Sequence, residues 1–284
     1  MDVGLALGAL NPRAWVEVTE EADRLGFESV WMSDHLVVPL DAAGSPHEGA
    51  DHPPIPSDVP VFDVFAYLAA LAARTSSIRL GTNVYNVGLR HPFVTARAAT
   101  TVDVLSGGRL LLGVGASWLR AEWDAVGLDF DTRGARVDET IAVLQRLWTE
   151  PVVAHDGRFF SFGPTAFEPK PVHAGGPPLH VGGDGPAALR RAATVGAGWI
   201  PMNHTLDDLG PSLSRLRQLG DRAGRTAPIE VTLNASDVRS VDDVARYADA
   251  GVTRIIVRPW RRSSEAIDAI RAFAADVLEP LRRG

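Results

Sequence analysis

The chain has 284 residues, of which 45% are hydrophobic and 22% charged, a composition typical of a globular protein with its own core. Its net charge of −7 argues against nucleic acid or an anionic membrane as the main partner. The absence of cysteine excludes disulfides, thiolate catalysis and cysteine-ligated metals, and with Lys170 as the only lysine, Schiff-base chemistry is nearly excluded. No apolar run approaches the ~18 residues of a membrane span and no cationic signal sequence is recognisable, so we expect a cytoplasmic protein.

Strand-like and helix-like patterns alternate along the whole chain. Short apolar segments predict eight strands, at Val3–Leu7, Phe27–Met32, Ile78–Val84, Arg109–Val114, Leu179–Val181, Trp199–Pro201, Ile229–Leu233 and Arg254–Val257. Amphipathic segments predict helices between them, notably from Asn11 to Leu25 and at Phe62–Ala73, Arg136–Trp148, Pro186–Val195, Asp207–Ala223, Val241–Ala250 and Ser264–Leu278.

This alternation predicts an α/β protein, a (β/α)8 TIM barrel, as a single domain over residues 1–284. A doubly wound sheet is the alternative, but the glycine-rich G-x-G-x-x-G motif is absent after the first strand. Two insertion loops, Leu36–Pro60 after the second strand and Val152–Pro178 after the fourth, exceed ordinary loop length and are candidates for binding loops. The second contains an expected hairpin that turns at Asp156-Gly157.

The ends of the predicted strands carry the candidate site residues, because the carboxyl ends of the strands form the active face of a barrel. Asp34 and His35 follow the second strand, where histidine could exchange a proton and aspartate could fix its tautomer. A strand-end turn with a helix-capping aspartate is an equally good interpretation of this pair. Gly81 and Asn83 interrupt the third strand, which indicates either a distorted backbone near a ligand or an ordinary strand end.

Glycines end the fourth and fifth strands. Gly113 and Gly115, followed by Ala116 and Ser117, could bring the backbone close to a ligand, or they could pack against the next helix. In the run VGGDGPAALRRAA, Gly182 and Gly183 precede a helix whose amino terminus could bind an anion, and a structural turn is the alternative. Asp184 is the expected N-cap of that helix, and its carboxylate would compete with an anion unless it points away.

Several other residues favour structural roles. His91 reads as a turn residue, and His155, His173 and His180 as structural histidines. His47 and His52 lack the spacing of metal ligands, so we predict no metal site. Trp118, just past the glycines of the fourth strand, could line a flat pocket.

Five motifs in order resemble the luciferase-like monooxygenase superfamily over roughly residues 2–202. They are GFESVWMSDH, RLGTNVYNVGLRHP, VDVLSGGRLLLGVG, RGARVDETIAVLQRLWT and PLHVGGDGPAALRRAATVGAGWIP. Within the superfamily the sequence is most similar to the branch that uses the 5-deazaflavin coenzyme F420. One departure stands out: Trp118 occupies the place where some sugar-phosphate dehydrogenases of that branch carry a glutamate.

The resemblance implies a cofactor cleft at the carboxyl end of the barrel, with the ring lying across the strand ends. It also implies a cis peptide bond between Asn83 and Val84 as a buttress for the ring. By the same resemblance, Asp34 and His35 contact the ring or act as acid and base, and Asn86 lies near it. The remaining cofactor contacts that it implies, on the phosphate side, are Gly115, Ala116, Ser117, Gly182, Gly183 and Asp184.

The leading hypothesis is therefore an F420-dependent oxidoreductase that transfers a hydride between the deazaflavin and a small organic substrate. His35 would donate or accept the proton, and Asp34 would contact the ring or orient the histidine. An FMN-dependent two-component monooxygenase and a non-catalytic flavin-binding protein are alternatives on the same fold. A metal-dependent barrel hydrolase is disfavoured because no His-x-His ends the first strand, where Ala6–Gly8 stands. The resemblance also implies a homodimer.

Overall fold

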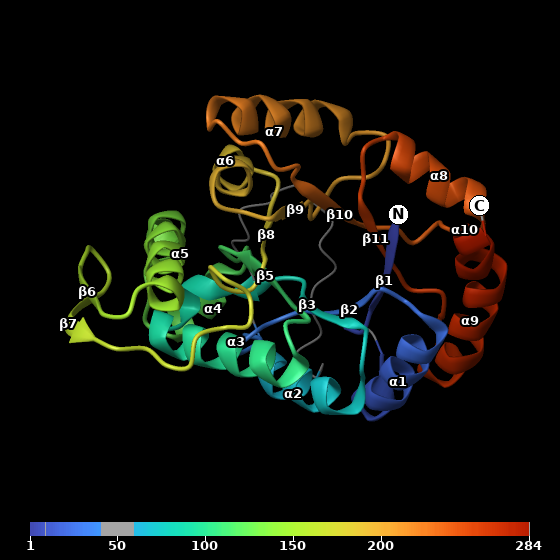
Figure 1. Ribbon diagram of the computed structural model, residues 1–284, viewed down its shortest axis with the longest axis horizontal. Coiled ribbons are helices and arrows are strands. Elements are labelled where there is room, and N and C mark those ends of the chain that lie inside the picture. Colours follow the sequence, from blue (N-terminus) through green and yellow to red (C-terminus); the bar gives the residue numbers. More distant parts are fainter. Residues whose placement is uncertain (9, 41–59, 284) are drawn as a thin grey trace.

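Eight parallel strands close into a barrel in the computed structural model, which describes residues 1–8, 10–40 and 60–283 (Figure 1). The barrel is closed by the pairing of β1 with both β2 and β11 and of β3 with β5. The strands follow one another in the order β1 (Asp2–Ala6), β2 (Ser29–Met32), β3 (Arg79–Thr82), β5 (Leu110–Gly115), β8 (Leu179–Gly182), β9 (Gly198–Ile200), β10 (Glu230–Asn234) and β11 (Arg254–Val257). The predicted (β/α)8 barrel and each of its eight predicted strands are thus confirmed.

Helices surround the barrel, and their bounds agree with the predicted segments to within a few residues. They are α1 (Trp15–Leu25), α2 (Val64–Arg74), α3 (Pro92–Ser106), α5 (Arg133–Thr149), α6 (Pro186–Thr194), α7 (Gly210–Arg222), α8 (Val241–Asp249) and α9 (Ala266–Phe273), with α10 (Glu279–Arg283) after a π-helical turn. Local signals place the ends: Gly26 ends α1 in the left-handed conformation, and His91 caps α3 by accepting a hydrogen bond from the Phe93 N–H. The interpretation of His91 as a turn residue is therefore confirmed.

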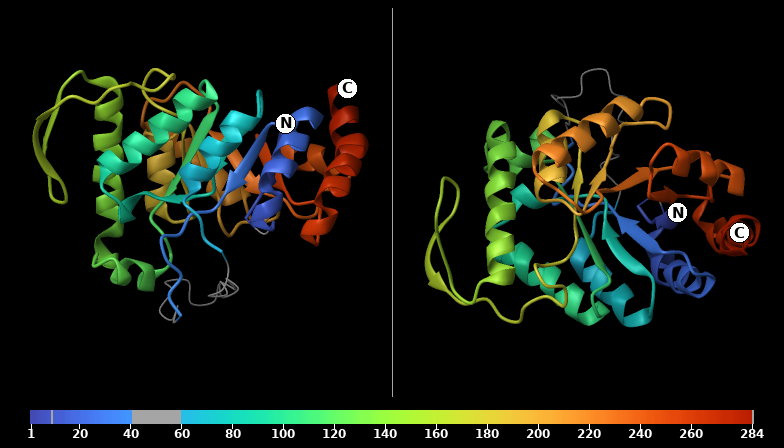
Figure 2. Two further views of the ribbon diagram at one scale, coloured as in Figure 1. Left: turned by 90° about the horizontal axis from the view of Figure 1, so that it is seen from below. Right: turned by 45° about the horizontal axis from the view of Figure 1, so that its top comes forward.

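The insertion after β5 and α5 contains the expected hairpin, formed by β6 (Val153–Asp156) and β7 (Ser161–Thr165). The hairpin stands out beside α5, on the side away from the barrel (Figure 2). Glu139 of α5 holds it, because one carboxylate accepts the backbone N–H groups of Phe159 and Phe160 and lies 3.1 Å from His155 Nε2. Most of the other predicted insertion, including His47 and His52, lies outside the described residues.

The interior of the barrel is filled by large side chains below the carboxyl ends of the strands. Trp31 of β2 lies there with Leu111, Ile200 and Ile256, and its indole N–H donates to the Ser29 hydroxyl at 2.8 Å. At the amino-terminal end of the barrel the buried Arg254 pairs with Glu28 and Glu230. This filling makes the interior a packed core, so a ligand can reach only the strand ends.

Several short elements were not predicted, and two of them contribute residues to the site. The helix α4 (Arg120–Ala125) follows β5, and the two-residue strand β4 (Tyr85–Asn86) pairs with the end of β5. Among the described residues, no helix is both long and apolar enough to cross a membrane.

Gly81 offers a test of this interior packing. A Cβ atom added there would lie 2.3 Å from the ring of Trp31, which is 1% exposed and cannot move aside. We expect Gly81→Ala to lower the free energy of unfolding by about 1–3 kcal/mol through overpacking. Urea denaturation measures this, with Gly163→Ala as the control because a Cβ at Gly163 meets nothing within 4 Å. Equal stability of the two variants would contradict the packing described.

Candidate active site

The barrel mouth is the end of the barrel formed by residues at the carboxyl ends of the strands, among them His35, Asn83, Gly115 and Gly182. Its floor is built around a cis peptide bond between Asn83 and Val84, as expected. The Val84 side chain lies against two glycines: a Cβ at Gly115 would fall 2.6 Å from Val84 Cγ2, and one at Gly182 2.7 Å from Cγ1. Only glycine therefore lets β5 and β8 approach Val84 this closely.

Asn83 brings an unsatisfied polar atom to the floor. Its backbone N–H donates to the Met32 carbonyl at 2.7 Å, and its Nδ2 donates to Asn234 Oδ1 at 3.3 Å. The Oδ1 atom of Asn83 is buried without a hydrogen-bond partner within the described part of the chain. A buried acceptor left in this state favours a ligand that carries an N–H donor.

Asp34 is held by a buried ion pair. Its two carboxylate oxygens lie 2.7 and 2.8 Å from the guanidinium nitrogens of Arg90, and one of them also accepts the backbone N–H of Asn86 at 2.9 Å. The side chain of Asn86 donates in turn to the Asp34 carbonyl oxygen. With 0% exposure of the Asp34 side chain, this network ties the end of β2 to the residues that follow β3.

Arg90 keeps its charge although it is largely buried. Burial lowers the pKa of its guanidinium, but the hydrogen bonds and charge of Asp34 outweigh that effect and raise it. The guanidinium also lies over the ring of Tyr85, 4.4 Å from the centroid. Burial raises the pKa of the Tyr85 phenol to about 12, so this ring stays neutral beside the ion pair. Arg90 was not predicted as a partner of Asp34.

His35 pairs with a glutamate rather than with its neighbour in the sequence. Its Nδ1 lies 3.2 Å from Oε2 of Glu122 on α4, and Oε1 of the same carboxylate accepts the Leu36 N–H at 2.6 Å. The Glu122 side chain is 0% exposed and that of His35 is 14% exposed. The expectation that Asp34 fixes the tautomer of His35 is wrong, because the Asp34 carboxylate is occupied by Arg90 and Glu122 occupies Nδ1.

Trp118 lies beside this pair, with its ring edge-on to the imidazole of His35 at a centroid distance of 6.5 Å. It follows Ser117, whose φ of 62° places a non-glycine residue in the left-handed region at the end of β5. Trp118 was expected near a pocket, but Glu122, four residues further on, was not predicted as a site residue. Glu122 is one of three charged residues in a six-residue helix that is too short to show a clear periodicity.

The turn after β8 differs in detail from the expectation. Asp184 does not cap α6; the N-cap is Gly185, which makes no side-chain hydrogen bond. The Asp184 carboxylate accepts instead from the backbone N–H groups of Met202 and Asn203, at 2.9 and 3.1 Å. Gly183, at φ +115°, donates its own N–H to the Ile200 carbonyl. Asp184 was therefore wrongly assigned as a cap, and it ties the turn to the segment after β9.

The structure thus brings Asp34, His35, Asn83, Val84 and Asn86 together, and it places Gly115 and Gly182 against Val84. The remaining predicted contacts, Ala116, Ser117, Gly183 and Asp184, follow the same two strands, β5 and β8. Within the described residues, no group of three or more histidine, aspartate or glutamate side chains could hold a metal ion.

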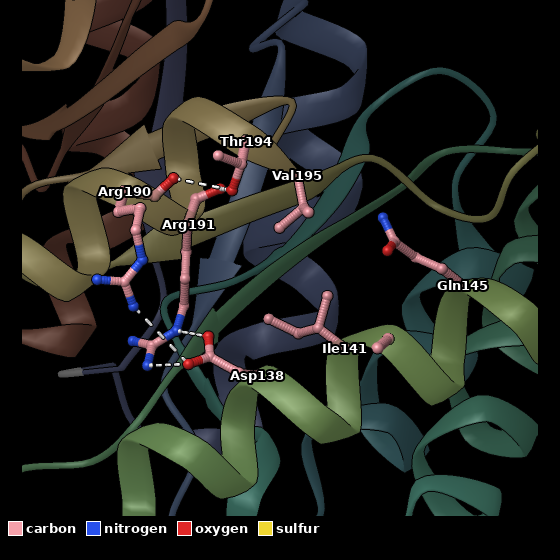
Figure 3. Close-up of a pocket in the computed structure, with 8 residues that line it drawn as sticks. Asp138, Ile141, Gln145, Arg190, Arg191, Thr194 and Val195 are labelled. Atoms are coloured by element: carbon pink, nitrogen blue, oxygen red, sulfur yellow. Dashed lines mark hydrogen bonds and ion pairs between the residues drawn. The ribbon is translucent and has the colours of Figure 1, made fainter. Parts of the chain in front are cut away.

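Surface cavities lie elsewhere. One of about 220 Å³ lies between α5 and α6, where Figure 3 shows Arg191 turned toward Asp138. Arg191 pairs there with Asp138 and donates to the Gly134 carbonyl, so these side chains join two helices. A second cavity, of about 500 Å³, lies beside α7 and β10. Neither of these two cavities is lined by a residue of the mouth.

A parallel barrel with titratable side chains and a glycine-lined floor at its strand ends is the architecture of a barrel enzyme. The sequence model of the luciferase-like monooxygenase family matches residues 2–237, and the chain belongs to this family.

Curated relatives are similar in sequence over much of the chain. An uncharacterised protein of Mycobacterium tuberculosis is 31% identical over 86% of this chain and 84% of its own. An F420-dependent glucose-6-phosphate dehydrogenase of Intrasporangium calvum is 30% identical over 86% of this chain and 72% of its own.

Solved structures agree in fold. The F420-dependent tetrahydromethanopterin reductase of Methanopyrus kandleri superposes with a TM-score of 0.77 at 18% identity, covering 98% of this chain and 99% of that one. The monooxygenase RslO1 of Streptomyces bottropensis gives a TM-score of 0.78 at 24% identity, covering 99% and 100%. Because a monooxygenase and an F420-dependent reductase superpose almost equally well, at 24% and 18% identity, these likenesses show the fold alone.

The Asp34–Arg90 pair predicts a measurable loss of stability. Asp34→Asn leaves the buried guanidinium without its counter-charge, and we expect the free energy of unfolding to fall by about 3–5 kcal/mol. The control is Glu20→Gln, which removes the partner of Arg74 in a pair whose arginine is 61% exposed and should cost at most about 1 kcal/mol. Denaturant unfolding of both variants measures these losses. If Asp34→Asn lowers the free energy of unfolding no more than Glu20→Gln does, the structural role of the Asp34–Arg90 pair is contradicted.

Proposed function

We propose that the protein is an F420-dependent oxidoreductase that transfers a hydride between the deazaflavin and a small organic substrate at the barrel mouth. The observation that carries the proposal is the position of His35, a titratable ring held by Glu122 at the same strand ends as the floor of Val84, Gly115 and Gly182. The 30% identity to an F420-dependent dehydrogenase supports the choice of cofactor.

The residues of the mouth fit a flat heterocyclic ring. Val84, whose side chain packs into the space that Cβ atoms at Gly115 and Gly182 would occupy, offers an apolar face to such a ring. The buried Asn83 Oδ1 lacks a donor among the described residues, and a ring N–H would supply one. When bound, F420 would supply a two-electron centre that accepts or releases a hydride.

The phosphate side of the cofactor would lie along the residues after β5 and β8. The N–H of Gly183 is committed to Ile200, Pro186 has no N–H, and the N–H of Ala188 donates to the Gly185 carbonyl. Within the described residues, the N–H of Ala187 is therefore the donor of the first turn of α6 that remains for an anion. The Asp184 carboxylate accepts the N–H groups of Met202 and Asn203, after β9. These two hydrogen bonds stabilise its negative charge and reduce its repulsion of a bound anion.

His35 would handle the proton that accompanies hydride transfer. In the oxidation of an alcohol, the carbon-bound hydrogen leaves with both bonding electrons, and the hydroxyl proton passes to Nε2 of His35. In the reverse direction His35 returns that proton to the carbonyl oxygen as the carbon receives the hydride. This chain has Trp118 at the position where some sugar-phosphate dehydrogenases of the branch carry a glutamate. We therefore do not propose a sugar phosphate as the substrate. Homodimer formation remains a prediction.

The acid–base role of His35 predicts a split between turnover and binding. In His35→Ala we expect kcat for alcohol or carbonyl substrates to fall by about 100- to 10,000-fold, while the Kd for F420 changes little. Steady-state kinetics and a fluorescence titration of the same preparation measure the two quantities. A variant that loses F420 binding but turns over normally at saturating cofactor would contradict the assignment.

A further inference from the structure

We infer that Glu122 is a positioning residue that holds the neutral His35 in the tautomer with its proton on Nδ1. The inference deepens the proposed function and rests on it for the catalytic consequence, whereas the tautomer itself is a property of the protein alone. Glu122 stands on α4, 87 residues from His35 in the sequence, so the contact depends on the fold rather than on local structure.

The contacts of the Glu122 carboxylate determine the direction of its hydrogen bond to His35. The side chain is 0% exposed, and an ionised carboxylate in such a place must be compensated by donors. Oε1 receives the Leu36 N–H at 2.6 Å, which leaves Oε2, 3.2 Å from His35 Nδ1. With Glu122 ionised, its carboxylate only accepts hydrogen bonds, so in the proposed arrangement Nδ1 carries the proton and Nε2 keeps its lone pair.

Burial and packing make this orientation rigid. The hydrogen bond from the Leu36 backbone fixes the carboxylate relative to the segment that carries His35, and the edge-on contact with Trp118 limits rotation of the imidazole. A carboxylate that holds one nitrogen of a histidine selects which nitrogen is free for proton transfer. Among the described residues Nε2 has no hydrogen bond, so Nε2 is the atom available to a substrate.

The chain contains a natural control for this arrangement. Glu139 likewise contacts both a histidine and backbone N–H groups. Its Oε1 lies 3.1 Å from His155 Nε2, and its carboxylate accepts the N–H groups of Phe159 and Phe160. That pair anchors the β6–β7 hairpin on α5, and the hydrogen-bond partners of Glu139 within the described residues do not include His35 or Glu122. Glu139→Gln therefore perturbs a similar but half-buried glutamate–histidine contact, in which the Glu139 side chain is 13% exposed, without touching His35.

The test is ¹⁵N NMR of the imidazole nitrogens in the cofactor-free protein, with His35→Ala used to assign the His35 signals. We expect the wild type to show the Nδ1–H tautomer. In Glu122→Gln the new amide can still accept from Leu36 but presents a donor to Nδ1, which should shift His35 toward the Nε2–H form. Glu139→Gln should leave the His35 signals unchanged. A wild-type spectrum of the Nε2–H form, or an unchanged tautomer in Glu122→Gln, would overturn the inference.

Kinetics provide the second readout. With F420 and a substrate, we expect kcat of Glu122→Gln to fall by about 10- to 100-fold with little change in the Kd for F420, and kcat of Glu139→Gln to stay near wild type. If the wild type turns over no F420 substrate while the tautomer behaves as expected, the proposed function fails and the positioning role stands. The wild-type spectrum decides the tautomer even if Glu122→Gln does not fold.

Discussion

The buried ion pair between Asp34 and Arg90 is the contact on which the mouth of this barrel depends. A carboxylate with no exposure to water is stable there only because a guanidinium binds both of its oxygens and Asn86 adds a backbone donor. The pair fastens the residues after β2 to those after β3, and His35 is the next residue along the chain. The position of His35 at the mouth therefore follows from this ion pair.

Two different kinds of surface meet at this mouth. One is an apolar floor in which Val84 packs against glycines of β5 and β8 and Asn83 leaves an acceptor unsatisfied. The other is the polar pair of His35 and Glu122, flanked by Trp118. A flat cofactor needs the first surface and proton transfer needs the second, so their adjacency is the physical basis of the proposed oxidoreductase. The packed core beneath, around Trp31, keeps ligands at the strand ends.

The fold could be predicted from the sequence because its signals are local. Apolar runs such as Arg254–Val257 mark buried parallel strands, and residues such as Gly26 end helices by their own backbone preference. The partners of the site residues could not be predicted, since they come from distant parts of the chain: Arg90 is 56 residues from Asp34, and Glu122 lies on a helix too short to show periodicity. Asp184 was misassigned because Gly185, beside it, can begin the helix without a side-chain cap.

The most direct measurement is an equilibrium fluorescence titration of the purified protein with F420 and, separately, with FMN. We predict saturable binding of F420 at one site per chain, with FMN binding much more weakly. The opposite preference would contradict the central claim; it would favour a flavin-dependent monooxygenase of the same family, for which oxygen uptake would be the next assay.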